Sequence, residues 1–276
     1  TEGGTVFFGV KENNYLGRGL GVDANIALSA ERFKGSLNVT DPNYKNSDKS
    51  TFISLQTIEI DQLKNFGYKT NKTGFEIGTA FEYLEDFNLG LSTSTFVEKI
   101  DTDSTASSRQ QAQAGNYLDT FVRLNFDLDK RDQKFKTSDG YRSNYNIQIP
   151  IVSDTNTITN SYNYKVYSEL FENNISSFSL FLKSATSITG DDVKLTERLS
   201  IPSYRLRGFE SGKVGPKDGA DFIGGNFITS INFQSTVPKI FENSQNLDAV
   251  MFFDAANVWG IDYDKSISEN SEIRSS

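Results

Sequence analysis

Two short stretches carry the residue types most able to form a specific polar interaction: Leu206-Arg207-Gly208-Phe209 and Met251-Phe252-Phe253-Asp254. The chemistry that they offer is ion pairing. Asp254 stands in an apolar run where a strand should pack, and a buried carboxylate is tolerated only when a cation and hydrogen bonds satisfy it. The pattern therefore predicts a buried Arg207–Asp254 pair, with the guanidinium also over the ring of Phe252. On the residues alone, a surface turn with an exposed arginine is an equal alternative.

Common catalytic and metal chemistries are missing from the composition. The 276 residues include neither cysteine nor histidine. The first absence excludes a disulfide scaffold, an iron–sulfur site and a thiol nucleophile, and the second excludes Ser-His-Asp catalysis and histidine-held zinc. The balance of 36 acidic against 28 basic residues argues against a surface for duplex nucleic acid. We therefore expect no enzyme, no cofactor, no metal site and no nucleic-acid partner.

The overall composition favours a membrane β-barrel. Hydrophobic residues make up only 36% of the chain and mean hydropathy is −0.46, yet aromatic residues reach 13%. No apolar run approaches the length of a membrane helix. Strands of a transmembrane β-barrel alternate lipid-facing apolar residues with residues of a polar lumen, so mean hydropathy stays low. This class reconciles the polar average with the many aromatic residues.

The strand period of two dominates the chain. Apolar and polar residues alternate most clearly at 19–31, 73–85 and 141–152. Weaker versions occupy 5–12, 33–41, 51–60, 87–98, 117–128, 161–172, 176–188, 222–237 and 247–259. We therefore predict an all-β fold, a transmembrane antiparallel β-barrel to which this chain contributes about twelve strands. The strand lengths disfavour a soluble secreted β-sandwich.

Short and long connections alternate, as is typical of the two rims of an outer-membrane barrel. The tight connections are 13–18, 85–86 and 172–175, and the long polar ones are 61–72, 99–116 and 189–221. Two further connections, 129–140 and 238–246, are longer than this rule prefers. Because no linker or composition shift interrupts the pattern, we expect one barrel domain over residues 1–276.

The loop 189–221 is too apolar for a free outer loop, since it contains Ile201, Tyr204, Leu206, Phe209 and Val214. A loop of this length in a compact protein is usually functional. We expect it to fold back into the barrel lumen and to pack there, where Arg207 would need a carboxylate.

The chain resembles the BamA family of outer-membrane barrel insertases, with a style closest to alphaproteobacterial members. The resemblance rests on ordered motifs along essentially the whole chain. These are GVKENNYLGRG at 9–19, Val39-Thr40-Asp41-Pro42, the turn 129–140 with Lys136 in place of the usual proline, Leu206-Arg207-Gly208-Phe209, Val214-Gly215-Pro216, Gly224-Gly225-Asn226 and the run FFDAANVW at 252–259. The last four motifs are the most specific.

The resemblance implies a sixteen-stranded barrel preceded by periplasmic POTRA domains. By that template the chain is a partial barrel domain truncated at both ends, without POTRA domains. The resemblance also implies a loop-lock motif of Leu206, Arg207, Gly208 and Phe209, and Gly224 and Gly225 are expected to be structural glycines. The lumen partners of Arg207 are expected to be Asp254, Phe252 and Gln234. Family members often have glutamate at the position of Gln234, so Asp254 is expected to be the sole counter-ion.

The function implied by the resemblance is folding and insertion of β-barrel proteins in the bacterial outer membrane, without nucleotide. The implied partners are unfolded outer-membrane β-barrel clients, accessory outer-membrane lipoproteins and the lipid bilayer. Two alternatives are a protein-secretion transporter or translocation-module relative of the same superfamily, and a passive outer-membrane channel. A passive channel has no reason to carry the Arg207–Asp254 pair.

Overall fold

The chain forms two compact units. The computed structural model describes residues 4–63, 67–104, 106–171, 174–219, 221–237, 249–262 and 273–276. Unit 1 comprises Thr1–Asn125, Ile147–Ile158 and Ser187–Leu195, and unit 2 comprises Phe126–Asn146, Thr159–Thr186 and Thr196–Ser276.

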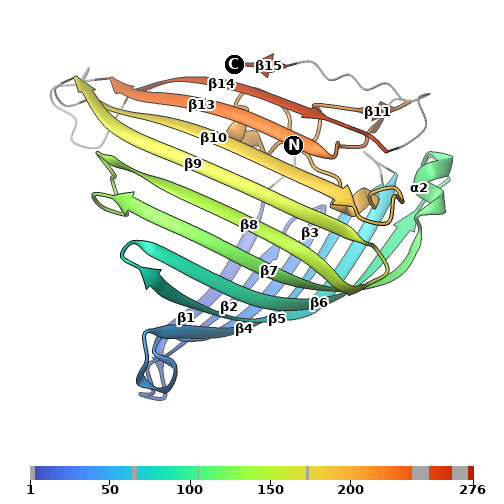
Figure 1. The fold of residues 1–276 in the computed structure, drawn as a ribbon. Coiled ribbons are helices and arrows are strands. Elements are labelled where there is room, and N and C mark those ends of the chain that lie inside the picture. The colour runs from blue at the N-terminus through green and yellow to red at the C-terminus, as the bar shows by residue number, and fades with distance from the viewer. Residues whose placement is uncertain are drawn as a thin grey trace. The chain divides into compact units, whose positions relative to one another are not determined.

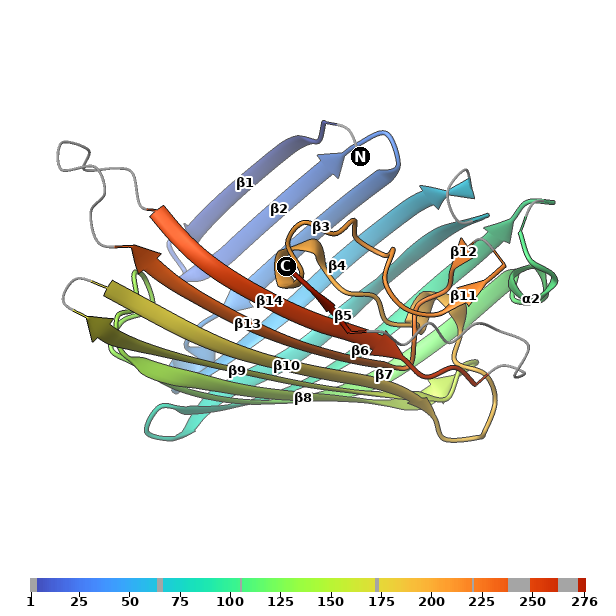
Figure 2. The same ribbon diagram turned by 90° about the horizontal axis from the view of Figure 1, so that it is seen from above.

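Antiparallel strands account for most of the described structure (Figures 1 and 2). The strands are β1 (Val6–Tyr15), β2 (Leu20–Leu28), β3 (Arg32–Asp41), β4 (Lys49–Gln62), β5 (Tyr68–Leu84), β6 (Phe87–Thr102), β7 (Gly115–Arg131), β8 (Gly140–Ser153), β9 (Thr157–Phe171), β10 (Asn174–Ser187), β11 (Lys217–Asp218), β12 (Asp221–Phe222), β13 (Phe227–Val237), β14 (Ala249–Trp259) and β15 (Arg274–Ser275). The helical elements are α2 (Ser108–Ala112) and three 3-10 helices, η1 (Tyr44–Asn46), η2 (Leu195–Glu197) and η3 (Ser203–Arg205). Within the described ranges, no helix has the length and apolar character needed to cross a bilayer.

Thirteen of the described strands form one sheet in simple chain order. The order runs from β1 to β10 and continues through β13, β14 and β15, while β11 and β12 form a separate two-stranded sheet. Pairing of each strand with its neighbours in the chain is the up-and-down arrangement that short connections allow. The prediction of an all-β antiparallel fold is confirmed.

Alternating rows of side chains run across the strands of unit 1. Leu37, Leu55 and Phe75 are register partners on β3, β4 and β5, and they are 40%, 49% and 43% exposed. One residue along, the row on the opposite face holds Asn38 and Ser54, and Ser54 Oγ donates to Asn38 Oδ1 at 2.6 Å. The period of two therefore gives unit 1 an exposed apolar face and a polar face that forms hydrogen bonds.

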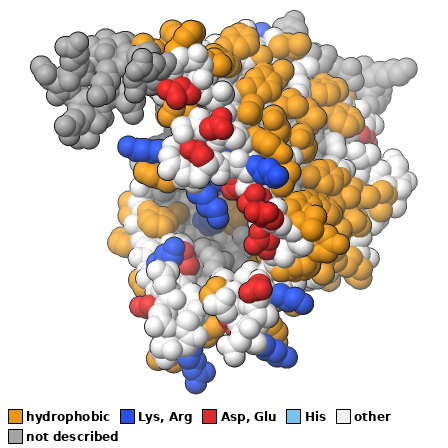
Figure 3. Space-filling view, turned by 60° about the vertical axis from the view of Figure 1, so that its left-hand side comes forward, with side chains coloured by type: hydrophobic (Ala, Val, Ile, Leu, Met, Phe, Trp, Pro, Cys, Tyr) orange, Lys and Arg blue, Asp and Glu red, His pale blue; other side chains and the backbone are white. Residues whose placement is uncertain are grey.

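The same division of faces holds in unit 2. Phe178, Phe233 and Phe253 are register partners on β10, β13 and β14, and each is more than one-third exposed. The neighbouring row on the other face holds Asn232 opposite Asp254, which is fully buried. Figure 3 shows hydrophobic side chains gathered over one part of the surface and charged side chains gathered apart from them.

Several strand boundaries differ from the predictions. The connection predicted at 61–72 is wrong, because β4 continues to Gln62 and pairs there with Tyr68 of β5. The connection predicted at 99–116 is likewise shorter, with β6 ending at Thr102 and β7 beginning at Gly115. Beyond the apolar part of a strand both faces are polar, so the alternation stops while the backbone ladder continues. Residues 223–226, predicted as strand, precede β13, and the predicted connection 238–246 lies outside the described residues.

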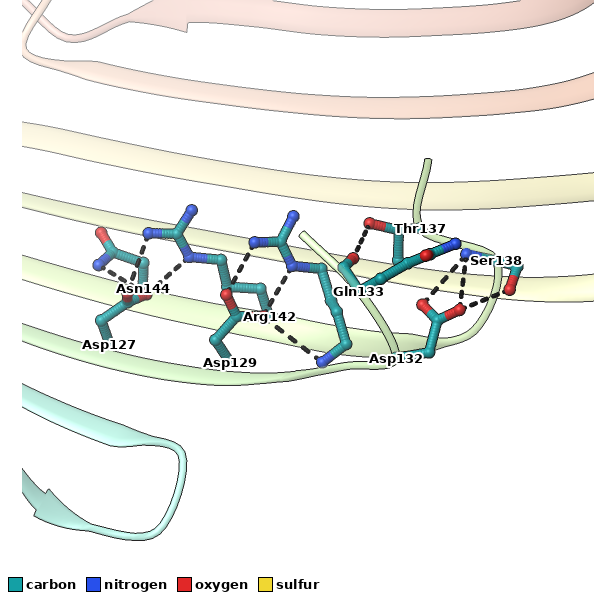
Figure 4. A network of polar contacts seen from close by, with 9 residues as sticks. Asp127, Asp129, Asp132, Gln133, Thr137, Ser138, Arg142 and Asn144 are labelled. Atoms are coloured by element: carbon teal, nitrogen blue, oxygen red, sulfur yellow. Dashed lines mark hydrogen bonds and ion pairs between the residues drawn. The ribbon is translucent and has the colours of Figure 1, made fainter. Parts of the chain in front are cut away.

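The turn between β7 and β8 is held by its own polar side chains (Figure 4). Asp132 accepts hydrogen bonds from the backbone nitrogen and the hydroxyl of Ser138, at 3.1 and 2.6 Å, and Thr137 Oγ1 donates to Gln133 O at 2.7 Å. The bond from the Ser138 hydroxyl is the main cause that holds the pKa of Asp132 below its ordinary value. Lys136 has a φ of +53°. Because proline fixes φ near −65°, this turn excludes the proline that the resemblance leads one to expect at Lys136.

Candidate functional site

The connection between β10 and β13 packs much of its apolar surface. Its buried side chains, all at most 6% exposed, are Val193, Leu195, Leu199, Ile201, Leu206, Val214 and Ile223. Tyr204 is the exception among the apolar and aromatic residues considered from the sequence, since it is 70% exposed. Within unit 2 the loop lies beside β13 and β14 (Figure 2). A segment with little regular structure is therefore held by side-chain packing and by hydrogen bonds to these strands.

Arg207 and Asp254 form a bidentate ion pair. Arg207 Nε donates to Asp254 Oδ2 and Nη2 donates to Oδ1, both at 2.7 Å. The backbone nitrogen of Arg207 donates to Oδ2 at 3.1 Å, and Asn232 Nδ2 donates to Oδ1 at 2.8 Å. The Asp254 carboxylate thus accepts four hydrogen bonds, which is what an ionised group at 0% exposure requires.

Two further side chains complete the surroundings of the guanidinium. Its carbon lies 3.6 Å from the centroid of the Phe252 ring, and Nη1 donates to Gln234 Oε1 at 3.3 Å. The hydrogen bond to Asp254 is the main cause that raises the pKa of Arg207 above its ordinary value, so the residue stays charged. We call Asn232, Gln234, Phe252 and Asp254 the arginine seat.

Strand register explains why these four residues meet. Asn232 is the partner of Asp254 across β13 and β14, and Gln234 is the partner of Phe252. Residues two apart on a strand share a face, so both pairs point to the same side of the sheet. The structure therefore brings Arg207 together with all three partners expected from the sequence. Asn232 was missed, although its spacing of two from Gln234 on the same predicted strand was a usable signal.

The other residues of the loop-lock motif shape the turn that carries Arg207. Leu206 is 1% exposed, Phe209 is half-buried, and the backbone nitrogen of Phe209 donates to Leu206 O at 3.4 Å. Gly208 has a φ of +81°, a conformation that L side chains rarely adopt. A buried leucine and a glycine in the left-handed region thus flank the arginine.

Gly224 and Gly225 let the end of the loop approach its neighbours closely. A Cβ on Gly225 would lie 2.6 Å from Trp259 O, and one on Gly224 would lie 2.7 Å from Leu199 O. Leu199 and Gly225 also exchange two backbone hydrogen bonds, at 2.8 and 2.9 Å. Neither glycine position has room for a methyl group.

Comparison with known proteins identifies the family. Residues 14–276 match the Omp85 superfamily domain. The chain belongs to the Omp85 superfamily. The predicted location, the bacterial outer membrane, follows from this membership.

Within the Omp85 superfamily, the chain is similar to BamA proteins. It is 23% identical over 216 residues to the outer membrane protein assembly factor BamA of Neorickettsia risticii (strain Illinois). These aligned residues make up 76% of this chain and 29% of that relative. The structure of BamA from Haemophilus ducreyi lacking POTRA domains 1–3 matches with a TM-score of 0.83 and 18% identity, over 93% of this chain and 55% of the other. The structure of CdiB from Acinetobacter baumannii matches with a TM-score of 0.56 and 10% identity, over 93% of this chain and 46% of CdiB.

These matches confirm the resemblance to the BamA family and the transmembrane β-barrel fold. The chain spans less than one-third of the length of its curated relative and about half of each solved structure.

A second buried ionic cluster lies in unit 1 of this Omp85 domain. Lys194 Nζ lies 2.7 Å from Glu98 Oε2 and 2.7 Å from Asp119 Oδ2, and the three side chains are at most 3% exposed. The Lys194 ammonium also lies 4.7 Å from the centroid of the Tyr117 ring. Ser153 Oγ donates to the Asp119 carboxylate. Lys194 belongs to the same long loop as Arg207, so this cluster fixes an earlier part of that loop to β6 and β7.

Sequence reasoning missed the Lys194 cluster. Glu98 lies two residues from Phe96 and from Ile100, and Asp119 lies two residues from Tyr117 and from Phe121, so each carboxylate shares a strand face with apolar or aromatic residues. That spacing was a usable signal for two buried carboxylates, but it does not show that Lys194 of the loop is the cation that pairs with them.

Proposed function

We propose that this chain is the core barrel of an outer-membrane protein assembly machine, which folds and inserts β-barrel proteins without using nucleotide. The observation that carries the proposal is the bidentate Arg207–Asp254 pair, in which a loop is fixed to the polar face of the sheet. A passive channel needs no such attachment. The likeness to BamA, with a TM-score of 0.83, favours assembly over the secretion alternative.

The proposed activity needs strand pairing rather than covalent chemistry. An unpaired strand edge presents backbone N–H and C=O groups, which template an incoming client strand. In the hydrocarbon region every backbone polar group must be satisfied, so pairing with a template lowers the free-energy cost of inserting a strand. The loop 189–221 lies in the lumen and braces the barrel wall through the arginine seat. The proposed activity assigns no residue the role of a catalytic acid, base or nucleophile.

The proposed partners follow from this activity. Unfolded outer-membrane β-barrel proteins are the clients, accessory outer-membrane lipoproteins join the assembly, and the lipid bilayer receives the product. Nucleic acid has no part in it.

The test uses the full-length protein that contains this chain, reconstituted in liposomes. Folding of a denatured barrel client is followed by heat-modifiable gel mobility, with wild type, Arg207→Ala and Lys213→Ala compared. Lys213 is the matched control because it belongs to the same loop and its side chain is 50% exposed, in a surface pair with Glu210. Wild type and Lys213→Ala should accelerate folding, and Arg207→Ala should not. Absence of acceleration by wild type, with ion conductance intact, would contradict the assembly function.

A further inference from the structure

A polar pocket of about 200 Å³ adjoins the arginine seat in unit 2. Residues of β9, β10, β13 and the long loop line it. Three of them are cations, Lys165, Arg205 and Arg207, and all the others carry a hydroxyl or an amide. The described lining contains no carboxylate.

Within the described part of the chain, two of the three cations have no carboxylate as counter-ion. Arg207 is neutralised by Asp254, but among the described residues no carboxylate forms an ion pair with Arg205 or Lys165. Arg205 Nη2 donates to Asn163 Oδ1 at 3.1 Å, and the guanidinium carbon lies 3.8 Å from the centroid of the Phe181 ring. Lys165 Nζ lies 4.8 Å from the centroid of the Tyr167 ring in the same strand.

The Nε atom of Arg205 is buried, and no described residue accepts a hydrogen bond from it. A buried donor of a charged group that has no acceptor keeps its full desolvation penalty, so buried donors normally have an acceptor. Aromatic contact and one amide oxygen do not replace that acceptor. The unpaired donor and the missing counter-charge therefore indicate the same thing, an anion.

We propose that this pocket binds one oxyanion, a carboxylate or a phosphate. Arg205 offers a planar fork of donors that suits such groups, and Lys165 offers a compact charge. The hydroxyls of Ser177 and Ser179 line the same pocket and can donate to further oxygens. The two positive charges of Arg205 and Lys165, which no carboxylate of the described residues neutralises, give the pocket a positive electrostatic potential that attracts an anion.

The pocket shares Asn232 and Gln234 with the arginine seat, but Arg205 and Lys165 do not belong to the seat. An anion between Arg205 and Lys165 links the loop to β9, whereas Asp254 links it to β14. Anion binding therefore adds a third attachment to the loop, and this holds whether or not the chain assembles barrel proteins.

Binding is measured by titration calorimetry on the full-length protein in detergent micelles. The probes are inorganic phosphate and acetate, with sodium chloride keeping the ionic strength constant. Arg205→Gln and Lys165→Gln should weaken binding about tenfold or more, because each removes a charge-assisted hydrogen bond. Lys213→Gln, which changes an exposed lysine of the same loop, should bind as wild type does.

Heat-modifiable gel mobility shows whether each variant is folded. A further variant, Ser179→Ala, keeps every charge of the pocket and should weaken anion binding several-fold. Saturable binding of phosphate alone identifies a phosphate site, and binding of acetate as well identifies a general oxyanion site. No saturable binding of either probe to wild type would overturn the proposal, and so would equal binding by wild type, Arg205→Gln and Lys165→Gln.

Discussion

At the scale of single residues, the site depends on one carboxylate that has no access to water. In place of water, the Asp254 carboxylate accepts four hydrogen bonds: two from the Arg207 guanidinium, one from the backbone nitrogen of Arg207 and one from the side-chain amide of Asn232. Removing one member of a buried pair costs far more than the pair contributes to stability, because the remaining charge stays desolvated. Truncation of either partner should therefore be severe, whereas the neutral and longer bond to Gln234 should matter little.

Arg207→Ala should lower the free energy of unfolding by about 3–5 kcal/mol, and Gln234→Ala by about 1 kcal/mol. Asp254→Asn should resemble Arg207→Ala, because it leaves the guanidinium without a carboxylate. Adding Gln234→Glu to Asp254→Asn supplies a carboxylate next to Nη1 and should restore about 1–2 kcal/mol. Urea unfolding of the full-length protein in micelles measures each value. A double variant no more stable than Asp254→Asn would show that Gln234 is not part of the seat.

Lys136 tests the turn between β7 and β8. Its φ of +53° is unfavourable for a side chain with a Cβ and inaccessible to proline. Lys136→Gly should stabilise the protein by roughly 1 kcal/mol, and Lys136→Pro should destabilise it by about 3 kcal/mol. Urea midpoints of the two variants give the comparison, and a Lys136→Pro variant as stable as wild type would rule out this turn conformation.

At the scale of elements, the long loop has an ionic attachment in each unit. Arg207 is held by β14 in unit 2, and Lys194 is held by β6 and β7 in unit 1. The attachment at Lys194 is the more deeply buried of the two, since all three side chains are at most 3% exposed whereas the side chain of Arg207 is 30% exposed.

Lys194→Met should cost about 3–5 kcal/mol, because it leaves two carboxylates buried without their cation. The matched control is Lys99→Met, which removes a lysine from a pair with Asp101 in which both side chains are at least half exposed and which should cost under about 1 kcal/mol. Hydrogen exchange at the Leu195 amide, which donates to Gln113 Oε1 at 2.6 Å, reports whether the loop has detached locally. Unchanged exchange and equal stability losses in the two variants would show that the cluster does not anchor the loop.

The strands were predictable from sequence to the extent that their two faces differ. At 19–31 and 73–85 the alternation placed β2 and most of β5, because one face there is apolar and the other polar. The ends of β4 and β5 were not predicted, because the pairing of Gln62 with Tyr68 extends the ladder beyond the residues in which apolar and polar types alternate. The arginine seat was largely predictable, since an aspartate in an apolar run is conspicuous. Lys194 was not, since its burial depends on the path of the loop.

At the scale of the whole molecule, the rows of exposed apolar side chains explain why this fold resides in a membrane. Leu37, Leu55 and Phe75 are exposed on one face, an arrangement that is costly in water and favourable in a bilayer. The polar rows carry the attachments of the loop. On β13 and β14, Phe233 and Phe253 lie on the exposed face while Asn232 and Asp254 hold the loop on the other, so membrane residence and loop binding use opposite faces of these two strands.

Leu55 lies at the middle of β4, so Leu55→Lys should cost about 2–4 kcal/mol in a bilayer. Ser54→Lys, one residue away on the polar face, should cost under about 1 kcal/mol. Urea unfolding from lipid vesicles compares them. Similar losses in the two variants would contradict the assignment of the Leu55 face to lipid.

The tight approach at Gly225 has a consequence for how the loop can move. With 2.6 Å between a hypothetical Cβ and Trp259 O, and with a bidentate bond at Arg207, the loop has no clearance for small displacements. Closely packed contacts of this kind switch between discrete arrangements rather than deforming gradually. This end of the loop can therefore leave its place only by breaking the contacts at Gly225 and Arg207, and it cannot shift by stretching them.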